Sequence, residues 1–311
     1  MRYLIFGDTH IPVAPRFFEH RLTELCAIVQ QYKCTKAIQL GDLFDLYHMT
    51  NDHIDLFMQM VVRLRKAGIE QFHIIQGNHE IPKHTGIAPI SQILDRFGEA
   101  GFCIESVSTP RYIDDIFYAV PYCTTLPEIP HGAMIVSHLD PPLVKQIQAQ
   151  CNPVGLFNGH NHTPRKYGEN IYDVGSLFPI EFDKKYKDKN YYVVGKGHRF
   201  KLRPFPQQIA QRIVEINSAK DLSELERNSE FSLVKTIIKT KEIGRKQIKR
   251  MRDEGHIAQI AFDYKYELSI ENELQEIQEL FSENAELLRS IDFKLYAQIS
   301  DTLNTLVQKG E

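Results

Sequence analysis

Five short polar clusters, each at the end of a short apolar run, limit the fold of this chain more than any other feature. The apolar runs lie at 3–6, 37–40, 72–76, 133–137 and 155–159. The clusters that follow them read, in order, GDTH, GDLFD, GNHE, SH and GHNH. Helical patterns over 16–32 and 52–67 separate the first three runs, and a further apolar run lies at 191–194, so we expect a layered α/β fold. Because ligands bind beyond the carboxyl ends of the strands in such folds, the five clusters should meet at one site.

Composition excludes several classes of protein. The chain has 311 residues, of which 42% are hydrophobic and 25% are charged, as in a globular protein with a sizeable core. A formal net charge of −3 argues against a polycation that binds nucleic acid by bulk charge alone. No apolar stretch has the length of a transmembrane helix and the start is not a signal peptide, so we expect no membrane association. The five cysteines are widely spaced without a C-x-x-C pair, which favours the reducing cytoplasm.

The composition changes after residue 203, where the sequence RPFPQQ carries two prolines and is typical of a linker. We therefore expect a domain over 1–203 that carries the polar clusters, a capping region over 204–268, and an amphipathic helical tail over 269–311. In the tail, apolar residues recur at three- and four-residue spacing. Such a stripe packs either on the protein itself or on a partner helix, and both interpretations stay open.

The capping region contains a run of basic side chains. Lysine and arginine neutralise the phosphates of a nucleic acid backbone, so this run is a candidate for DNA contact. Its residues are Lys235, Lys239, Lys241, Arg245, Lys246, Lys249, Arg250 and Arg252. The solvated face of an exposed helix or strand pair would account for the same run, and this alternative stays open.

The five clusters together supply seven candidate metal ligands with carboxylate, amide and imidazole groups. They are Asp8, His10, Asp42, Asn78, His138, His160 and His162. Oxygen and imidazole donors without thiolates suit Mn²⁺, Fe²⁺ or Zn²⁺, and we expect Mn²⁺. Seven ligands are enough for two ions that share a carboxylate, and two ions about 3.5–4 Å apart stabilise both the attacking and the leaving oxygen of displacement at phosphorus.

The order of the clusters resembles the motifs D-x-H, G-D-x-x-[DH], G-N-H-[DE], H and G-H-x-H of the calcineurin-like metallophosphoesterases. All five motifs match, over about the first 165 residues. The resemblance implies a double-layered β-sandwich flanked by helices, here with a smaller C-terminal α+β or helical extension. It also implies a role for each matching residue. Asp8, His10 and His162 would hold the first ion, Asn78, His138 and His160 the second, and Asp42 would bridge both.

The same resemblance gives His79 the role of general acid, outside the metal ligands. Water held between two divalent ions loses a proton near neutral pH, so a hydroxide is available to attack phosphorus. The leaving oxygen then needs a proton, and a histidine titrates in the right range to supply it.

Within that superfamily the chain is similar to the SbcD-type nuclease subunits of DNA repair and to the small subunit of phage recombination endonucleases. The similarity rests on the stretch AIQLGDLFD followed by HIIQGNHE, on the turn at 172–177, and on the C-terminal extension. It implies a Mn²⁺-dependent DNA endo- or exonuclease in the cytoplasm, or in the host cytoplasm for a phage protein. The implied partners are DNA and an SMC-like ABC ATPase, and association of two copies is left open. Asp45 stands where many cellular members have histidine, which weakens the prediction of an exonuclease activity like theirs.

Other activities remain open on the same fold. A phosphodiesterase or phosphomonoesterase that acts on a small molecule or nucleotide would need the same ligands. Protein phosphatases share the sequence GNHE, but they have Arg-Gly after the acidic residue of the second motif, where this chain has Leu46-Tyr47. A non-catalytic scaffold is disfavoured because such relatives lose ligands that this chain keeps.

Overall fold

A computed structural model of the chain describes residues 1–11, 15–45, 51–81, 94–98, 101, 103–178, 190–227, 232–239, 243, 250–251 and 259–262. The chain divides into two compact units, 1–262 and 263–311. The second unit, which includes the predicted amphipathic tail, lies outside the described residues. None of the described helices is both long and apolar enough to cross a membrane.

The first sheet has six strands in the order β12-β11-β1-β2-β3-β4. Their bounds are β1 Arg2–Phe6, β2 Lys36–Gln39, β3 Gln71–Ile75, β4 Ile104–Val107, β11 Tyr191–Lys196 and β12 Arg199–Pro204. Strands β1 to β4 are parallel, whereas β11 and β12 form an antiparallel hairpin at the edge beside β1. The parallel arrangement places the carboxyl ends of β1, β2 and β3, and the polar clusters that follow them, along one edge of the sheet.

The second sheet also has six strands, in the order β5-β6-β7-β8-β10-β9. Their bounds are β5 Arg111–Ile113, β6 Phe117–Val120, β7 Met134–Ser137, β8 Gly155–Asn158, β9 Arg165–Gly168 and β10 Ile171–Asp173. Strands β6, β7, β8 and β10 are parallel. The inward faces of the two sheets share one hydrophobic core, in which Tyr3 and Ile5 of β1 belong to the same cluster as Phe117 of β6 and Val136 of β7.

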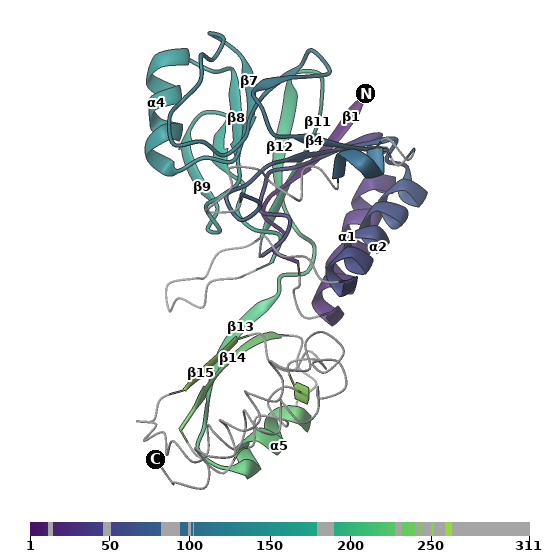
Figure 1. Cartoon of the computed structure of the whole chain (residues 1–311), viewed down its shortest axis with the longest axis vertical. Helices are drawn as coiled ribbons and strands as arrows, with labels where there is room; N and C mark the ends of the chain where they lie inside the picture. The colour runs from purple at the N-terminus through teal and green to yellow at the C-terminus, as the bar shows by residue number, and fades with distance from the viewer. Residues whose placement is uncertain are drawn as a thin grey trace, which may run out of the picture. The chain divides into compact units, whose positions relative to one another are not determined.

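Helices cover the outer faces of both sheets (Figure 1). On the first sheet, α1 (Pro15–Tyr32) and α2 (Asn51–Ala67) bury Leu22, Leu25 and Val61 against Leu4 and Phe6 of β1. On the second sheet, α4 (Pro141–Cys151) buries apolar side chains, Val144 and Ile147 among them, against the outer face of β7 and β8. Because β1 alternates its side chains between two cores, it is apolar throughout, which the sequence shows as a continuous apolar run.

The sequence predictions agree with these elements to within a few residues. The two predicted helices are α1 and α2, and the predicted apolar strands are β1, β2, β3, β7, β8 and β11. Two packed multi-stranded sheets flanked by helices confirm the predicted fold class.

The predicted linker contributes to the core. Phe205 and Ile209 are buried in the cluster between the first sheet and its helices. The guanidinium of Arg21, on α1, lies 4.1 Å from the centre of the Phe205 ring, and its Nη1 donates to the Gln207 carbonyl at 3.1 Å. This segment is therefore packed against α1 rather than solvated, while the domain boundaries at 203 and 268 stay predictions.

A third sheet follows, with β13 (Ala210–Ile216), β14 (Ser232–Ile238) and β15 (Gln259–Phe262) parallel to one another. Helix α5 (Ala219–Arg227) connects β13 to β14. Ile216 and Leu222 are buried there, together with Val234 and Ile238 of β14. The predicted capping region therefore contains a small α/β unit with its own apolar residues.

Candidate metal centre

The loops after β1, β2 and β3 carry Asp8, Asp42 and Asn78, and two glycines let them pack closely. Gly41 has φ +98°, and a Cβ there would lie 2.2 Å from Nδ1 of His138. A Cβ at Gly77 would lie 2.1 Å from Oδ1 of Asp42. Any side chain at either position would therefore push a candidate ligand out of place.

Asp42 is the central residue of the site. Its Oδ2 lies 3.2 Å from Nε2 of His138 and 3.9 Å from Nε2 of His10. Its carboxylate belongs to both of two groups of side chains whose ligand atoms lie within 4.8 Å of one another. This arrangement matches the bridging position that the resemblance implies for Asp42.

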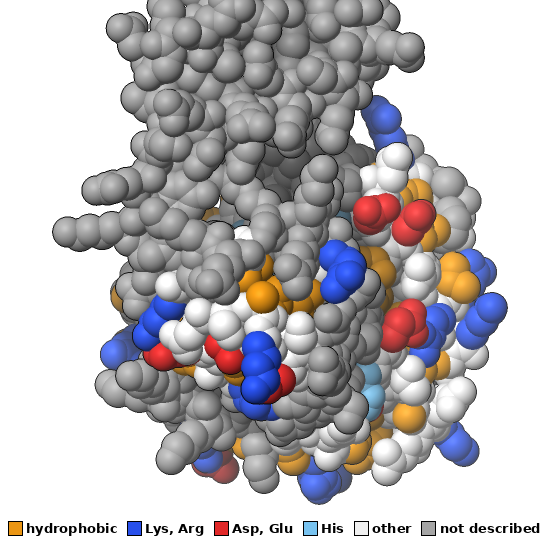
Figure 2. Space-filling view, turned by 90° about the horizontal axis from the view of Figure 1, so that it is seen from below, with side chains coloured by type: hydrophobic (Ala, Val, Ile, Leu, Met, Phe, Trp, Pro, Cys, Tyr) orange, Lys and Arg blue, Asp and Glu red, His pale blue; other side chains and the backbone are white. Residues whose placement is uncertain are grey.

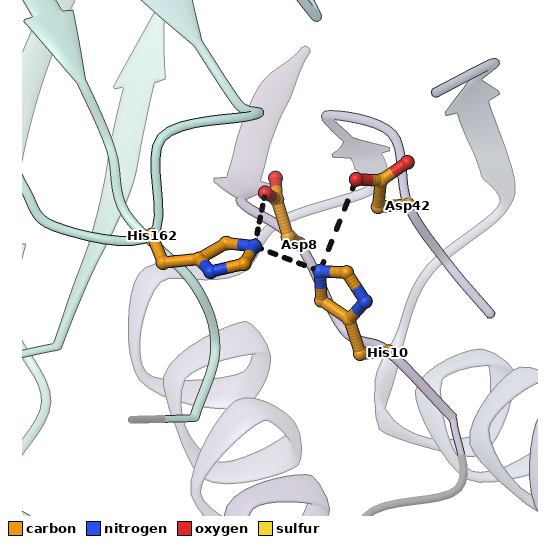
Figure 3. Close-up of side chains that lie close together, drawn as sticks. All are labelled: Asp8, His10, Asp42 and His162. Atoms are coloured by element: carbon orange, nitrogen blue, oxygen red, sulfur yellow. Dashed lines mark hydrogen bonds and ion pairs between the residues drawn. The ribbon is translucent and has the colours of Figure 1, made fainter. Parts of the chain in front are cut away.

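The first group consists of Asp8, His10, Asp42 and His162 (Figure 3). Nε2 of His10 lies 3.0 Å from Nε2 of His162, and the same His162 nitrogen lies 3.7 Å from Oδ2 of Asp8. Asp8 and His10 follow β1 and Asp42 follows β2 of the first sheet, whereas His162 lies in the loop after β8 of the second sheet.

The second group consists of Asp42, His138 and His160, and the Asn78 side chain joins it. Oδ1 of Asn78 lies 3.0 Å from Nε2 of His138 and 2.9 Å from Nδ1 of His160. His138 follows β7 and His160 follows β8, so the second sheet supplies both imidazoles. The structure thus brings all seven candidate ligands together in the two sets that the resemblance implies, while metal binding by them stays a prediction.

Contacts behind the histidines determine which ring nitrogen faces the centre. Nδ1 of His138 donates to the Leu40 carbonyl at 2.7 Å, since a carbonyl oxygen only accepts. Nδ1 of His10 lies 3.1 Å from the Asp45 carboxylate, and Nε2 of His160 lies 2.8 Å from that of Asp140. The opposite nitrogen of each ring faces the other candidate ligands. Histidine ligands of metal ions in proteins show this same pattern.

The charge balance of the centre favours a cation. Burial raises the pKa of the Asp8 carboxyl to about 6, and no described residue donates a hydrogen bond to its buried Oδ2. Burial would also raise the pKa of Asp42, but the charge of His138 outweighs this and holds it below its usual range. For His138, burial would lower the pKa, yet Asp42 raises it to about 9. Positive charge is thus stabilised beside these carboxylates, so the donor set fits divalent ions.

Three candidate ligands have left-handed backbone conformations. The φ angles are +48° at His10, +50° at Asp42 and +67° at His160. Such angles are uncommon for residues other than glycine, and they cluster at functional sites where the surroundings compensate the strain. The compensating contacts include the donation from the His160 backbone N–H to Oδ1 of Asp8 at 3.0 Å.

Glu80 holds the loops of this edge together, a role that the sequence analysis did not assign. Its buried carboxylate accepts from the backbone N–H groups of Gly77 at 2.7 Å, Phe44 at 3.1 Å and Asp42 at 3.2 Å. Burial and the neighbouring charge of Asp42 raise its pKa to about 7. The sequence could have indicated this role, because Glu80 is the last residue of the motif GNHE, two positions after the candidate ligand Asn78.

Asn158 and Asp173 hold together the loops that carry candidate ligands on the second sheet. The sequence analysis assigned a role to neither. The buried Asn158 amide accepts from the Leu139 N–H at 2.9 Å and donates to the Leu139 carbonyl at 2.9 Å. It also donates to the Asp173 carboxylate at 2.9 Å, and Asn161 donates to the same carboxylate at 2.9 Å. This network joins the segment of His138 to that of His160.

His79 lies beside the centre in a more exposed position. Its Nδ1 donates to the backbone carbonyl of Asp45 at 2.6 Å, and its Nε2 lies 4.0 Å from Oδ2 of Asp42. The side chain is 36% exposed. His10, Asp45 and His79 form a third group close enough to hold an ion, but the hydrogen bonds to Asp45 use Nδ1 of both histidines. The position therefore suits a proton donor at the rim.

Few of the predicted DNA-contact residues lie in the described part of the chain. Lys235 is half-buried on β14, Lys239 pairs with Glu215 at 2.9 Å, and Arg250 is exposed. Lys241, Arg245, Lys246, Lys249 and Arg252 lie outside the described residues. In Figure 2, basic and acidic side chains are interspersed over the described part of the visible face. The contact of this run with DNA stays a prediction.

Comparison with known proteins identifies the N-terminal part of the chain. The family model described as calcineurin-like phosphoesterase matches residues 1–198. Among solved structures, the nuclease MPE of Pseudomonas putida matches with 14% sequence identity and a TM-score of 0.34, over 61% of this chain and 83% of that one. A likeness at this level carries no argument about substrate. No curated protein matches the chain.

Proposed function

Because the chain belongs to the calcineurin-like phosphoesterases, we propose that it is a Mn²⁺-dependent phosphodiesterase whose substrate is DNA. The observation that carries the phosphoesterase part is the sharing of Asp42 between two groups of candidate ligands. Asp8, His10 and His162 would hold one ion, Asn78, His138 and His160 the other, and Asp42 both. When bound, two such ions generate a nucleophile from water near neutral pH and stabilise the charge that develops at phosphorus.

The side chains around the centre have separate tasks in this proposal. Glu80 and Asn158 hold the ligand-bearing loops in place through backbone hydrogen bonds. His79 supplies a proton to the leaving oxygen from Nε2, because its Nδ1 is engaged by the Asp45 carbonyl. Its partial exposure leaves it accessible to a substrate that binds across the centre.

Three observations support Mn²⁺ and DNA. Carboxylate, amide and imidazole donors without any cysteine in the two groups suit Mn²⁺. The chain is similar in its motifs to SbcD-type and phage recombination nucleases, in which such a domain is followed by a further region. A small parallel sheet of β13, β14 and β15 follows the phosphoesterase domain here, and basic residues lie on and after β14.

The same similarity supports the proposal that an SMC-like ABC ATPase is the partner, with the amphipathic stretch 269–311 as its docking segment. A chain that lacks 269–311 should keep metal binding and small-diester hydrolysis, because every candidate ligand precedes residue 163. It should lose co-purification with the ATPase and any ATP-stimulated cleavage of duplex DNA. Retained co-purification would contradict this assignment, and sedimentation of the full chain tests whether two copies associate.

The substrate is tested with protein stripped of metal by a chelator and then supplied with Mn²⁺. We expect Mn²⁺ to restore cleavage of linear duplex or single-stranded DNA and of bis-p-nitrophenyl phosphate. Hydrolysis of the small diester without cleavage of any DNA would favour the alternative, a phosphoesterase of small molecules or nucleotides. Undiminished activity after exhaustive chelation would contradict the metal centre itself.

A further inference from the structure

Asp140 stands immediately before α4, at the position where an aspartate normally caps a helix. Its side chain makes no capping hydrogen bond. The helix does not need one, because Pro141 and Pro142 have no N–H group to satisfy. The next two N–H groups, of Leu143 and Val144, donate to the Asp140 carbonyl at 2.9 and 3.2 Å. The Asp140 carboxylate is therefore available for another partner.

That partner is His160. Oδ1 of Asp140 lies 2.8 Å from Nε2 of His160. An ionised carboxylate only accepts hydrogen bonds, so Nε2 donates to Asp140, and in the neutral ring Nδ1 then keeps its lone pair. Nδ1 lies 2.9 Å from Oδ1 of Asn78 and 3.2 Å from Nε2 of His138, both candidate ligands of the second ion.

The Asp140 carboxylate also lies at the N-terminal end of α4. The positive end of a helix dipole stabilises a negative side chain. The Asp140 side chain is 44% exposed, so water also solvates its charge. A charged acceptor makes a stronger hydrogen bond to an imidazole N–H than a neutral one does.

We propose that Asp140 is a positioning residue that holds the His160 ring as an Nδ1 ligand of the second ion. The inference rests on the proposed metal centre. The backbone of His160 is fixed by its left-handed φ of +67° and by its N–H bond to Asp8, but neither contact selects the ring nitrogen that faces the ion. The Leu40 carbonyl performs the equivalent task for His138.

Metal affinity tests the role directly. Titration of the metal-free full chain with Mn²⁺, followed by calorimetry, gives the affinity and the number of bound ions. In Asp140→Ala we expect one of two sites to weaken by about 10–100-fold, the usual effect of removing such a partner, and the other to keep its affinity. Asp140→Asn keeps an acceptor without its charge and should lose less. Asp115→Asn is the matched control, since Asp115 is an exposed turn acid whose φ of +56° asparagine tolerates.

Nuclear magnetic resonance of the metal-free protein gives a second readout that does not depend on activity. At pH 8.5, proton–nitrogen correlations of the imidazole rings should show His160 as the Nε2–H form, with the signal assigned by His160→Gln. In Asp140→Ala the ring should become a mixture of both neutral forms. The melting temperature should hardly change, because the carboxylate does not cap α4.

The outcomes separate this inference from the proposed function. If Asp140→Ala binds both ions as tightly as the wild type does, and if the His160 ring keeps its proton on Nε2, only the role of Asp140 is overturned. Equal weakening of both sites would also overturn it, because a general structural effect would then explain the loss. A wild-type protein that binds no divalent ion would overturn the metal centre and this inference together. If Asp140→Ala fails to fold, Asp140→Asn decides the question by the same measurements.

Discussion

Two ends of the same sandwich contain buried charged side chains, and they differ in how the charge is balanced. At the candidate metal centre, beyond the carboxyl ends of β1, β2 and β3, Asp8 and Asp42 are surrounded by histidines. Toward the amino ends of the same strands lies a second cluster, here called the amino-end cluster. Its members are Tyr3, Lys36, Gln71, His73, Glu105, Arg111 and Asp114.

The amino-end cluster supplies its own cations. Lys36 pairs with Asp114, and Arg111 pairs with Glu105 at 2.9 Å. The Tyr3 hydroxyl donates to Asp114 at 2.8 Å, and Lys36 also donates to the Gln71 side chain at 2.8 Å. Two basic and two acidic groups balance there, so this cluster needs no bound ion. The comparison teaches that the candidate metal centre differs from a structural ion-pair network in the source of its positive charge, because histidines, which can give up a proton when an ion binds, surround its carboxylates in place of lysine and arginine.

The largest expected effect comes from removing one carboxylate at each end. Asp42→Ala removes the group shared by both sets of ligands, so we expect loss of both ions and a fall in phosphodiester hydrolysis of about 10³-fold or more. Asp114→Asn should leave activity unchanged and lower the free energy of unfolding, since Lys36 loses its ionic partner. Metal analysis, steady-state kinetics and urea unfolding measure the two results. Full metal occupancy in Asp42→Ala would remove the basis of the comparison.

His79 beside the candidate metal centre and His73 in the amino-end cluster provide a second comparison of the two ends. His79→Ala should keep both ions but slow cleavage of DNA by about 10²–10⁴-fold, the usual range for a lost general acid. Hydrolysis of bis-p-nitrophenyl phosphate should suffer less, because its leaving group needs no proton. His73 is buried in the amino-end cluster, so His73→Gln should alter stability and leave both rates unchanged. Equal losses on both substrates in His79→Ala would point to a role other than proton donation.

A smaller effect concerns the protons that metal binding displaces. Burial would lower the pKa of His138, but the charge of Asp42 raises it to about 9, so the ring is protonated at neutral pH without metal. A metal ligand must be deprotonated, so binding should release protons, and affinity should rise with pH until the His138 pKa is passed. Calorimetry in buffers of different ionisation enthalpy counts the released protons. Proton release should persist in Asp114→Asn, and its absence in the wild type would contradict the assignment of His138.

Sequence reasoning could single out the candidate ligands because each motif keeps its residues adjacent in the chain. Asp8 and His10, or His160 and His162, are recognisable before any fold is known. The sequence did not indicate a role for Asp140. Its contact with His160 depends on the conformation of the loop after β8, and two prolines at the start of α4 make a capping hydrogen bond unnecessary. The left-handed backbone of Asp42 is likewise set by packing against neighbouring loops rather than by its own residue type.

The amino-end cluster left no signal in the sequence. Lys36 lies on β2 and His73 on β3, whereas Glu105 lies on β4 and Asp114 in the turn after β5. The parallel register places Lys36 opposite Gln71 and His73 opposite Glu105, and the second sheet adds Asp114, which pairs with Lys36. A network whose members come from five strands and a turn is visible only once the sheet order is known.

The smallest expected effect is a pH dependence of stability that belongs to the amino-end cluster. Burial holds the pKa of His73 below its ordinary value, because the charged ring loses solvation that Glu105 only partly replaces. In the unfolded chain the ring titrates near its ordinary pKa of about 6.5. As the pH falls below that value, the unfolded state takes up a proton that the folded state does not. The contribution of His73 to stability is therefore complete above about pH 6.5. Below that pH the free energy of unfolding declines by at most about 1.4 kcal/mol per pH unit.

Urea unfolding of the metal-free protein between about pH 5 and pH 8, in the presence of a chelator, measures this slope. The chelator removes the contribution of metal binding, whose own pH dependence would otherwise overlap. His73→Gln should flatten the decline relative to the wild type, because glutamine does not titrate. His138 has the opposite sign: its raised pKa stabilises the metal-free fold at neutral pH, and that contribution is lost as the pH rises through about 9. An unchanged acid slope in His73→Gln would show that His73 is protonated in the folded state, and the amino-end cluster would then carry excess positive charge rather than balance itself.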